Sequence, residues 1–359
     1  MRRRDVLAGA GSLTAGATLG IPAPAIAQTT RQLTMVTDWP DTLPGLLPGA
    51  KRLARTIEEA SGGRIRIEVF ASGALVRPFE TLDAVQEGVA DMYHSFAGYF
   101  EKQSPAFHFY SGVPFGFTAS ELFAWVRFGG GQELWDELSG QFNIKPLLGM
   151  STGTQMGGWF NGAITSVDGF QGLRYRMAGP GAEVLRRLGA TVVTLPGSEI
   201  VSSLRSGAID ACEWIGPWLD MALGLHEAAA YYYYPAWHEP GTAQTFGINR
   251  AVWESFDSGD RRLIEACAAG EYAQSLADFN ANNALALRKL RDDGRVTILA
   301  FDDSLVNTFR EISSDVLAEV ASGDDLSRHI YASYMEFRAL IRDWSDISER
   351  AYLNSRALS

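Results

Sequence analysis

Three polar side chains in the middle of the chain fall at separate turns between short apolar segments. They are Gln155, Arg176 and Glu213, and Trp214 follows the last of them directly. An amide, a cation and a carboxylate that leave strand ends into one crevice are able to hold a small carboxylate ligand. Nothing in this group resembles the machinery of a hydrolase. The residue types therefore indicate a binding site for a small organic acid.

Motifs of several enzyme classes are absent from the sequence. It contains no zinc-protease, P-loop or β-lactamase motif, and its two cysteines and five histidines show no zinc-ligand spacing. One match to the G-x-S-x-G pattern surrounds Ser151, but Gly153 and Gly157 oppose the helix that a nucleophile elbow requires. One enzymatic alternative stays open at this point, namely an exported, metal-assisted hydrolase or lyase that acts on a small carboxylic acid.

The elements that must position these residues begin with an alternation of strand and helix patterns. Residues 33–37, 65–69 and 91–96 are predicted to form strands, because apolar residues alternate in them or fill them. Residues 46–60 and 79–87 show the spacing of amphipathic helices. Strand–helix–strand units of this kind predict parallel pairing with right-handed crossovers.

A second stretch repeats this arrangement. Residues 191–195 are predicted to form a strand, and Ser198 is predicted to cap a short helix that Gly207 ends. The segment around Gly207 and Asp210 aligns with the one around Gly88 and Asp91 at a constant offset (207 − 88 = 119 and 210 − 91 = 119). The alignment favours two similar α/β lobes over one large sheet.

The C-terminal part of the sequence is predicted to be helical. Asp257 or Ser258 can cap a helix whose apolar stripe continues to about Gly294. A helix of this length is long for a globular domain, so it either braces two lobes or packs on a partner chain. Two further helices are predicted over residues 304–321 and 326–344.

The composition makes nucleic acid a poor partner. The chain has a formal net charge of −11, which repels phosphate backbones and anionic lipid. An acidic protein that binds an anion must do so at a local positive site, which draws attention to Arg176.

We expect Cys212 and Cys267 to be buried free thiols rather than a disulfide.

The N-terminus has the pattern of an export signal. Arginines at positions 2–4 precede a weakly apolar segment and an Ala-x-Ala site at residues 25–27, which is typical of a Tat-type signal peptide over residues 1–27. Cleavage would leave Gln28 rather than a cysteine, so no lipid anchor is expected. No later apolar run reaches the roughly 18 residues of a membrane span. We therefore expect a folded protein in the periplasm.

Taken in order along the chain, several segments resemble the periplasmic solute-binding proteins of TRAP transporters, the DctP family. The resemblance covers nearly the whole chain after the signal segment. The segments that carry it are residues 71–75, 87–91, 172–176 and 204–210, together with the long late helix. Within the family, Gln155, Glu213, Trp214 and the region around Glu239 resemble the branch that binds 2-oxo or 2-hydroxy monocarboxylates.

The resemblance implies a fold of two hinged α/β lobes of the periplasmic binding protein type. A long helix would brace both lobes, and further helices would follow at the C-terminus. Residues 32–152 and about 241–280 would form the first lobe. Residues 153–240 and about 281–359 would form the second lobe and the C-terminal dimerisation helices. The protein would be a receptor, not an enzyme, and would close its lobes over the ligand.

The resemblance also implies roles for the polar residues. Arg176 would pair with the ligand carboxylate, because a guanidinium offers two parallel N–H bonds that lysine cannot copy. Gln155, Glu213 and the carbonyl of Trp214 would hold a metal ion, sodium or alternatively calcium, together with the ligand. Arg174 is expected to face solvent.

The remaining expectations concern the walls of the crevice and the partners. Aromatic side chains would exclude water from the Arg176 pairing, and Glu239 would contact the ligand or its neighbours. The expected aromatic wall consists of Tyr99, Phe100, Trp214 and Trp218. The family further implies membrane permease subunits of a TRAP transporter as partners and a homodimer formed by exchange of a helix.

Overall fold

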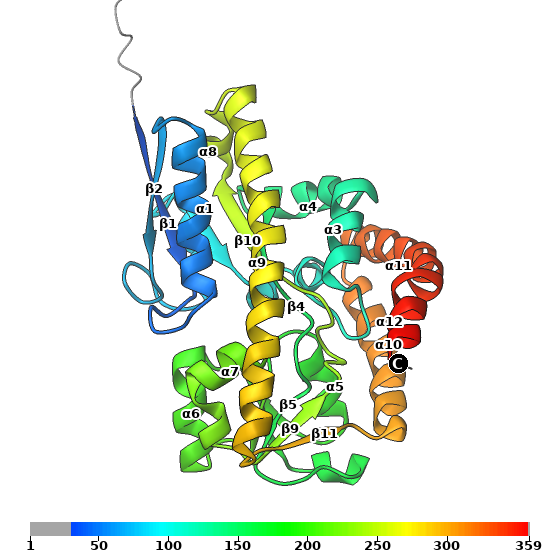
Figure 1. Ribbon diagram of the computed structural model, residues 1–359. Coiled ribbons are helices and arrows are strands. Elements are labelled where there is room, and N and C mark those ends of the chain that lie inside the picture. The colour runs from blue at the N-terminus through cyan, green and yellow to red at the C-terminus, as the bar shows by residue number, and fades with distance from the viewer. Residues whose placement is uncertain (1–29, 358–359) are drawn as a thin grey trace, which may run out of the picture.

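The chain folds around two β-sheets that lie one above the other, with a long helix beside both (Figure 1). The computed structural model describes residues 30–357, so the expected signal segment 1–27 lies outside the described residues. The five-stranded sheet has the order β2-β1-β3-β10-β4, and the six-stranded sheet has the order β11-β9-β5-β8-β6-β7. This two-lobed α/β fold agrees with the predicted fold class.

The first sheet contains the strands that were predicted to pair in parallel. Its strands are β1 (Arg31–Thr37), β2 (Ile65–Phe70), β3 (Met92–Ser95), β4 (Ile144–Gly153) and β10 (Thr242–Asn249). β1 pairs in parallel with β2 and β3, while β10 runs antiparallel between β3 and β4. The helices of this lobe are α1 (Leu46–Ala60), α2 (Thr81–Gln86), η1 (Ala97–Phe100), η2 (Pro105–Tyr110), α3 (Ala119–Phe128), α4 (Gly131–Gly140) and α8 (Arg250–Glu254).

The second sheet is built from shorter strands. They are β5 (Gly158–Phe160), β6 (Arg174–Arg176), β7 (Thr191–Val193), β8 (Ala211–Cys212), β9 (Tyr231–Tyr234) and β11 (Thr297–Ala300). Its helices are η3 (Val167–Phe170), α5 (Gly181–Arg187), α6 (Gly197–Ser206), α7 (Pro217–Leu223) and η4 (Leu225–Glu227). The predicted cap at Ser198 is wrong, because the capping position is Pro196, two residues earlier, and Ser198 lies in the first turn of the helix.

The internal repeat predicted from the sequence is visible in equivalent hydrogen bonds. At the start of β3, Asp91 accepts a hydrogen bond from the backbone N–H of Thr34 (2.8 Å). At the start of β8, Asp210 accepts one from the backbone N–H of Arg174 (3.0 Å). Each carboxylate therefore fixes the register of a parallel strand pair, at the same place in its lobe.

Helix α9 (Ser258–Asp293) braces both lobes, as the sequence predicted. The Asp257 side chain caps its first turn, and Gly294 ends it in the left-handed conformation. On the first lobe, its Ser275 hydroxyl accepts a hydrogen bond from the backbone N–H of Ser151 (2.9 Å). On the second lobe, its Asn283 accepts one from the backbone N–H of Trp218 (3.0 Å).

The C-terminal helices differ from the expectation that residues 281–359 all belong with the second lobe. They are α10 (Asp303–Ala321), α11 (Asp325–Ser345), a π-helical turn η5 (Asp346–Arg350) and α12 (Ala351–Arg356). α10 packs on the second lobe, where Phe309 stacks on Trp237. α11 packs on the first lobe, where the Tyr334 ring lies in the aromatic core against the ring of Phe117. The Tyr334 hydroxyl accepts a hydrogen bond from the backbone N–H of Phe117 (2.9 Å).

Within residues 30–357, none of the helices combines the length and the hydropathy of a membrane span. Cys212 and Cys267 are both buried and free, in agreement with the prediction.

Candidate functional site

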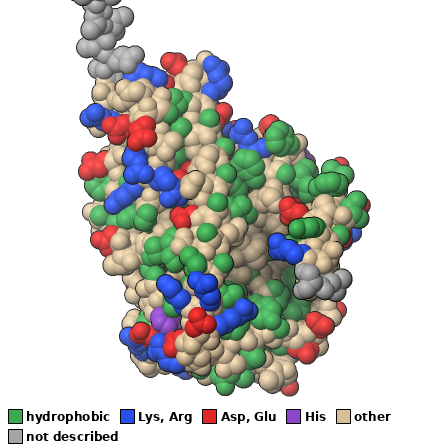
Figure 2. Space-filling model, in the orientation of Figure 1, with side chains coloured by type: hydrophobic (Ala, Val, Ile, Leu, Met, Phe, Trp, Pro, Cys, Tyr) green, Lys and Arg blue, Asp and Glu red, His purple; other side chains and the backbone are tan. Residues whose placement is uncertain are grey.

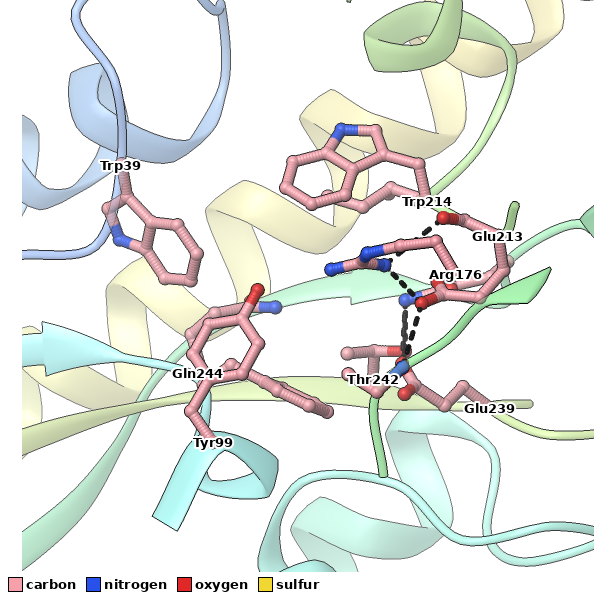
Figure 3. Close-up of a pocket in the computed structure, with 12 residues that line it drawn as sticks. Trp39, Tyr99, Arg176, Glu213, Trp214, Glu239, Thr242 and Gln244 are labelled. Carbon is pink, nitrogen blue, oxygen red and sulfur yellow. Dashed lines mark hydrogen bonds and ion pairs between the residues drawn. The ribbon is translucent and has the colours of Figure 1, made fainter. Parts of the chain in front are cut away.

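A pocket of about 330 Å³ lies between the two sheets. Its lining residues are Trp39, Phe96, Tyr99, Gln155, Arg176, Ala178, Glu213, Trp214, Ile215, Glu239, Thr242 and Gln244. In Figure 3, Trp39 faces Trp214 and Arg176 across the gap, and Tyr99 and Gln244 approach it from the first lobe.

The topology explains why these residues meet. Trp39 follows β1 and Phe96 follows β3, while Arg176 ends β6 and Glu213 follows β8. β1 and β3 are a parallel pair, and so are β6 and β8. The carboxyl ends of parallel strands form the usual ligand crevice of α/β proteins.

Arg176 is the cation of the pocket, and it is only 1% exposed. Its Nε donates to the Leu195 carbonyl (3.1 Å), and its Nη1 donates to the Glu213 carbonyl (3.1 Å) and to the Glu213 carboxylate. The Trp214 ring lies 5.1 Å from the guanidinium carbon. Burial opposes the charge, but Glu213 and other neighbours raise the pKa of Arg176, which keeps it protonated. Among the described residues no hydrogen-bond acceptor is found for Nη2.

Two buried carboxyl groups, those of Glu213 and Glu239, interact electrostatically with the Arg176 guanidinium. Burial raises the pKa of Glu213 to about 7, although Arg176 opposes the shift. Burial and repulsion from Glu213 raise the pKa of Glu239 well above its usual range. The pocket therefore holds more acidic groups than its arginine can neutralise, and a bound cation would relieve the imbalance.

Two oxygen atoms of the pocket residues, Oε1 of Gln155 and the carbonyl of Trp214, accept no hydrogen bond from the described residues. Gln155 donates from Nε2 to Glu239 (2.7 Å) and to the hydroxyl of Thr242 (2.9 Å), which leaves its Oε1 buried without a hydrogen bond. No donor to the Trp214 carbonyl is found in the described part of the chain. Amide, carboxylate and carbonyl oxygens are the donors that sodium and calcium prefer, so this set fits a hard cation.

A zinc-type site is not present in residues 30–357, because no group of three or more His, Cys, Asp or Glu side chains is placed to hold a metal ion. The oxygen set described above differs from such a site, since an amide and a backbone carbonyl supply two of its donors.

The aromatic wall of the first lobe is held in place by its own contacts. The Trp39 indole N–H donates to Nδ1 of the buried His94 (2.8 Å). Tyr99 packs edge-on against Phe96, with ring centroids 5.2 Å apart, and burial raises the pKa of its hydroxyl. These rings shield the Arg176 guanidinium from bulk water, which strengthens any charge pairing there.

Most residues singled out from the sequence lie at the pocket, but two do not. Phe100 is fully buried in the core of the first lobe, where it packs on Tyr93 and Phe107. Trp218 lies outside the pocket lining and packs against Phe279 of α9. Both predictions placed an aromatic residue by its distance from a strand end. The Phe100 side chain turns into the core instead, and the partly buried Trp218 packs on the long helix.

The structure also shows where Arg174 and Ser151 lie. Arg174 is half exposed and pairs with Asp210, away from the pocket. Ser151 lies inside β4 and donates to the Thr242 carbonyl (2.9 Å), so no nucleophile elbow forms around it.

Sequence reasoning missed several lining residues, of which Trp39, Thr242 and Gln244 are the most informative. Gln244 and Thr242 lie on β10, a strand that is buried along its whole length. The polar residues at the start of this strand, Thr242, Gln244 and Thr245, are the signal that could have identified it, because buried polar groups require partners.

The chain is similar to known proteins over most of its length. The family model for bacterial extracellular solute-binding proteins, family 7, matches residues 41–324. A monocarboxylate 2-oxoacid-binding periplasmic protein from a Nostoc strain is 37% identical over 320 residues, which cover 89% of this chain and 87% of that protein.

Two solved structures share the fold closely. A TRAP transporter solute-binding protein from Bordetella bronchiseptica, a mixed-occupancy dimer with copurified calcium and picolinate, has a TM-score of 0.89 and 30% identity, with coverage of 92% and 98% of the two chains. A TRAP periplasmic solute-binding protein from Pseudoalteromonas atlantica with bound sodium and pyruvate has a TM-score of 0.88 and 31% identity, with coverage of 91% and 99%.

Proposed function

This chain belongs to the bacterial extracellular solute-binding proteins of family 7, the solute receptors of TRAP transporters, and we propose that it binds a small 2-oxo acid. Pyruvate or a longer 2-oxo monocarboxylate is the ligand class that we propose. Members of this family are receptors rather than enzymes, so the hydrolase or lyase alternative is set aside. The observation that carries the proposal is that Arg176 and Gln155 line the same pocket, each with one polar atom, Nη2 and Oε1, that has no partner among the described residues.

The carboxylate of the ligand pairs with Arg176 in this proposal. Nε and Nη1 already donate to protein oxygens, so Nη2 supplies the N–H groups that meet the ligand. Hydrogen bonds between charged groups contribute about 1.5–3 kcal/mol each, and the dry pocket favours the upper part of that range. The bonds to Leu195 and Glu213 hold the guanidinium in place before the ligand arrives.

Gln155, Glu213 and the Trp214 carbonyl would hold a cation next to the acid. A bound cation supplies positive charge that offsets the surplus of carboxylates and attracts the 2-oxo oxygen. We propose sodium, with calcium as the alternative, because one carboxylate from the protein and one from the ligand suit a monovalent ion. Similar proteins carry sodium or calcium. The pocket walls formed by Trp39, Tyr99 and Trp214 would contact the substituent of the acid.

We further propose that the protein acts in the periplasm and delivers its ligand to TRAP permease subunits. The signal-like pattern of residues 1–27 and the membership of an extracellular receptor family support this location. Division of the chain at about residues 153, 241 and 281 remains our proposal for the lobe boundaries, except that α11 belongs with the first lobe. The first two positions are supported by the places where the chain passes between the sheets, after β4, which ends at Gly153, and before β10, which begins at Thr242.

A homodimer is the oligomeric state that we propose. Apolar side chains lie exposed along α11 and the turn after it: Leu340, Trp344 and Ile347 are 69%, 64% and 75% exposed. Figure 2 shows hydrophobic side chains gathered over α11. An apolar stripe of this kind requires a cover in water, and a second copy of the chain supplies one. One similar structure is a dimer, which supports the proposal.

Native mass spectrometry of the purified protein tests the proposal as a whole. We expect a dimer in which each protomer retains one small 2-oxo acid and one sodium or calcium ion. Added pyruvate should bind in a one-to-one ratio and be recovered unchanged. A copurified sugar or amine, or conversion of the acid to another compound, would contradict the proposed ligand class or the receptor function.

A further inference from the structure

Asp220 of α7 carries a buried carboxylate, 1% exposed, that accepts four hydrogen bonds. Its Oδ1 accepts from the backbone N–H groups of Ile215 (3.1 Å) and Gly216 (3.0 Å). Its Oδ2 accepts from the Trp159 indole (2.8 Å) and the Tyr232 hydroxyl (2.7 Å). The described groups that act on it are its four neutral donors, and no basic side chain is among them. A buried anion with only neutral donors is costly, and such groups commonly have a specific role.

The bond to Ile215 fixes the orientation of the peptide that ends at the Trp214 carbonyl. The Ile215 N–H and the Trp214 C=O belong to one planar trans peptide unit, in which they point in opposite directions. Because the N–H points at Asp220, the carbonyl points away from it. The next peptide is fixed as well, since the Gly216 N–H also bonds to Asp220 and the Ile215 carbonyl accepts from the N–H of Met156 (3.1 Å).

The other carboxylate oxygen is anchored to the second sheet. Trp159 of β5 and Tyr232 of β9 are directly paired across the two strands, and their rings stack with centroids 3.9 Å apart. Both donors to Oδ2 are therefore fixed by strand pairing and by ring packing. Asp220 in this way connects the rigid sheet to the loop that carries Glu213 and Trp214.

We propose that Asp220 is the positioning residue of the cation site, which it builds by orienting and polarising the Trp214 carbonyl. This inference rests on the proposed function, because it concerns the cation that the proposed ligand requires. An anion that accepts the N–H of a peptide increases the negative partial charge on the carbonyl oxygen of the same unit. Groups behind a metal ligand that orient it in this manner typically change metal affinity about 10–100-fold when they are replaced.

The Asp220→Asn variant separates the charge of this group from its shape. We expect its affinity for sodium and for calcium, measured by tryptophan fluorescence at a fixed pyruvate concentration, to fall about 10-fold or more. Pyruvate binding at saturating cation should stay close to the wild-type value. Asp91→Asn is the matched control, because Asp91 also holds a backbone N–H, at a distance from the pocket. It should leave the cation affinity unchanged.

Amide hydrogen exchange supplies a readout that does not depend on binding. Ile215 and Gly216 lie in neither a helix nor a strand, yet both amides should exchange slowly in the wild type and faster in Asp220→Asn. Tyr232→Phe, which removes one donor to Oδ2, should show a smaller change in the same direction and serves if Asp220→Asn fails to fold.

The outcomes distinguish this inference from the proposed function. A wild-type protein that binds no 2-oxo acid, or binds it without regard to cation, would overturn the proposed function and this inference together. If the wild-type protein shows cation-dependent binding and the Asp220→Asn variant has the same cation affinity as the wild type, the inference alone is overturned. Fast exchange of the Ile215 and Gly216 amides in the wild type would also overturn it.

Discussion

At the scale of single residues, Arg176 is fixed by the protein before it meets any ligand. Bonds to the Leu195 carbonyl and to Glu213 hold two of its three nitrogens, and the Trp214 ring lies against its face. A side chain held in this way loses little conformational entropy on binding, so more of its interaction energy is available as affinity.

Arg176→Lys should weaken binding of pyruvate at least about tenfold, or 1.4 kcal/mol. Lysine carries the charge but has one nitrogen, which cannot bond to Leu195, Glu213 and a ligand in the same geometry. Isothermal titration calorimetry measures the effect. Arg174→Lys is the matched control, because Arg174 is half exposed and pairs with Asp210. Unchanged affinity in Arg176→Lys would remove Arg176 from the site.

The buried histidines give a prediction that depends on pH. Burial lowers the pKa of His94 and of His238 to about 3. Because a lowered pKa keeps imidazole neutral, both rings should remain unprotonated as the pH falls from 8 to 5. His94 should carry its proton on Nε2, since its Nδ1 accepts from Trp39. Nitrogen-15 NMR of the imidazole rings checks this, and titration of either ring near pH 6.5 would contradict it.

At the scale of elements, the segment after β1 connects the first lobe to the crevice. Gly45 precedes α1 with φ = 78°, and a Cβ there would lie 2.7 Å from Cζ of Phe279 and 3.1 Å from Cζ3 of Trp218. This segment, which includes Trp39, therefore packs tightly on α9 and on the second lobe. Trp218 thus contributes to the contact between lobes rather than to the pocket wall.

Gly45→Ala should lower both the stability and the affinity for pyruvate. The left-handed conformation costs a non-glycine residue about 1–2 kcal/mol, and the clash with Phe279 adds to this. Urea unfolding and calorimetry measure the two effects. Gly62→Ala is the control, because Gly62 has a similar φ of 62° but open space around its Cα. If both variants lose stability equally and bind pyruvate normally, the tight contact between lobes is wrong.

Local sequence signals predicted many elements but only part of the site. The apolar spacing of residues 46–60 and the Asp257 cap predicted α1 and the start of α9, because both features act within one helix. Strand ends drew attention to Arg176 and Glu213 for the same local reason. Trp39 also follows a strand and carries the same signal, although sequence reasoning missed it. Gln244 lies inside β10 and reaches the pocket only when that strand pairs with distant strands.

At the scale of the whole molecule, the pocket is shared by two lobes, and the second lobe supplies most of its charge. Arg176 and Glu213 belong to the second sheet, while Tyr99 and Gln244 approach from the first. A ligand that contacts both sides stabilises the closed arrangement by its differential affinity for that arrangement. In the function that we propose, closure is the step in which binding energy changes the shape of the receptor.

The exposed stripe on α11 gives a prediction about assembly. The double variant Leu340→Glu and Trp344→Glu should be a monomer, because two charges on the apolar stripe oppose burial against a second copy. Sedimentation equilibrium measures the mass. Arg328→Glu, at an exposed position nearer the start of the same helix, should remain a dimer. A double variant that stays dimeric would place the interface elsewhere.

A crystal structure of the protein with pyruvate and sodium tests the central claim most directly. We predict that the pyruvate carboxylate lies within hydrogen-bond distance of Nη2 of Arg176, and that the ion contacts Oε1 of Gln155, the Glu213 carboxylate and the Trp214 carbonyl. A pyruvate bound elsewhere, or an Arg176 side chain turned out into bulk solvent, would contradict the account.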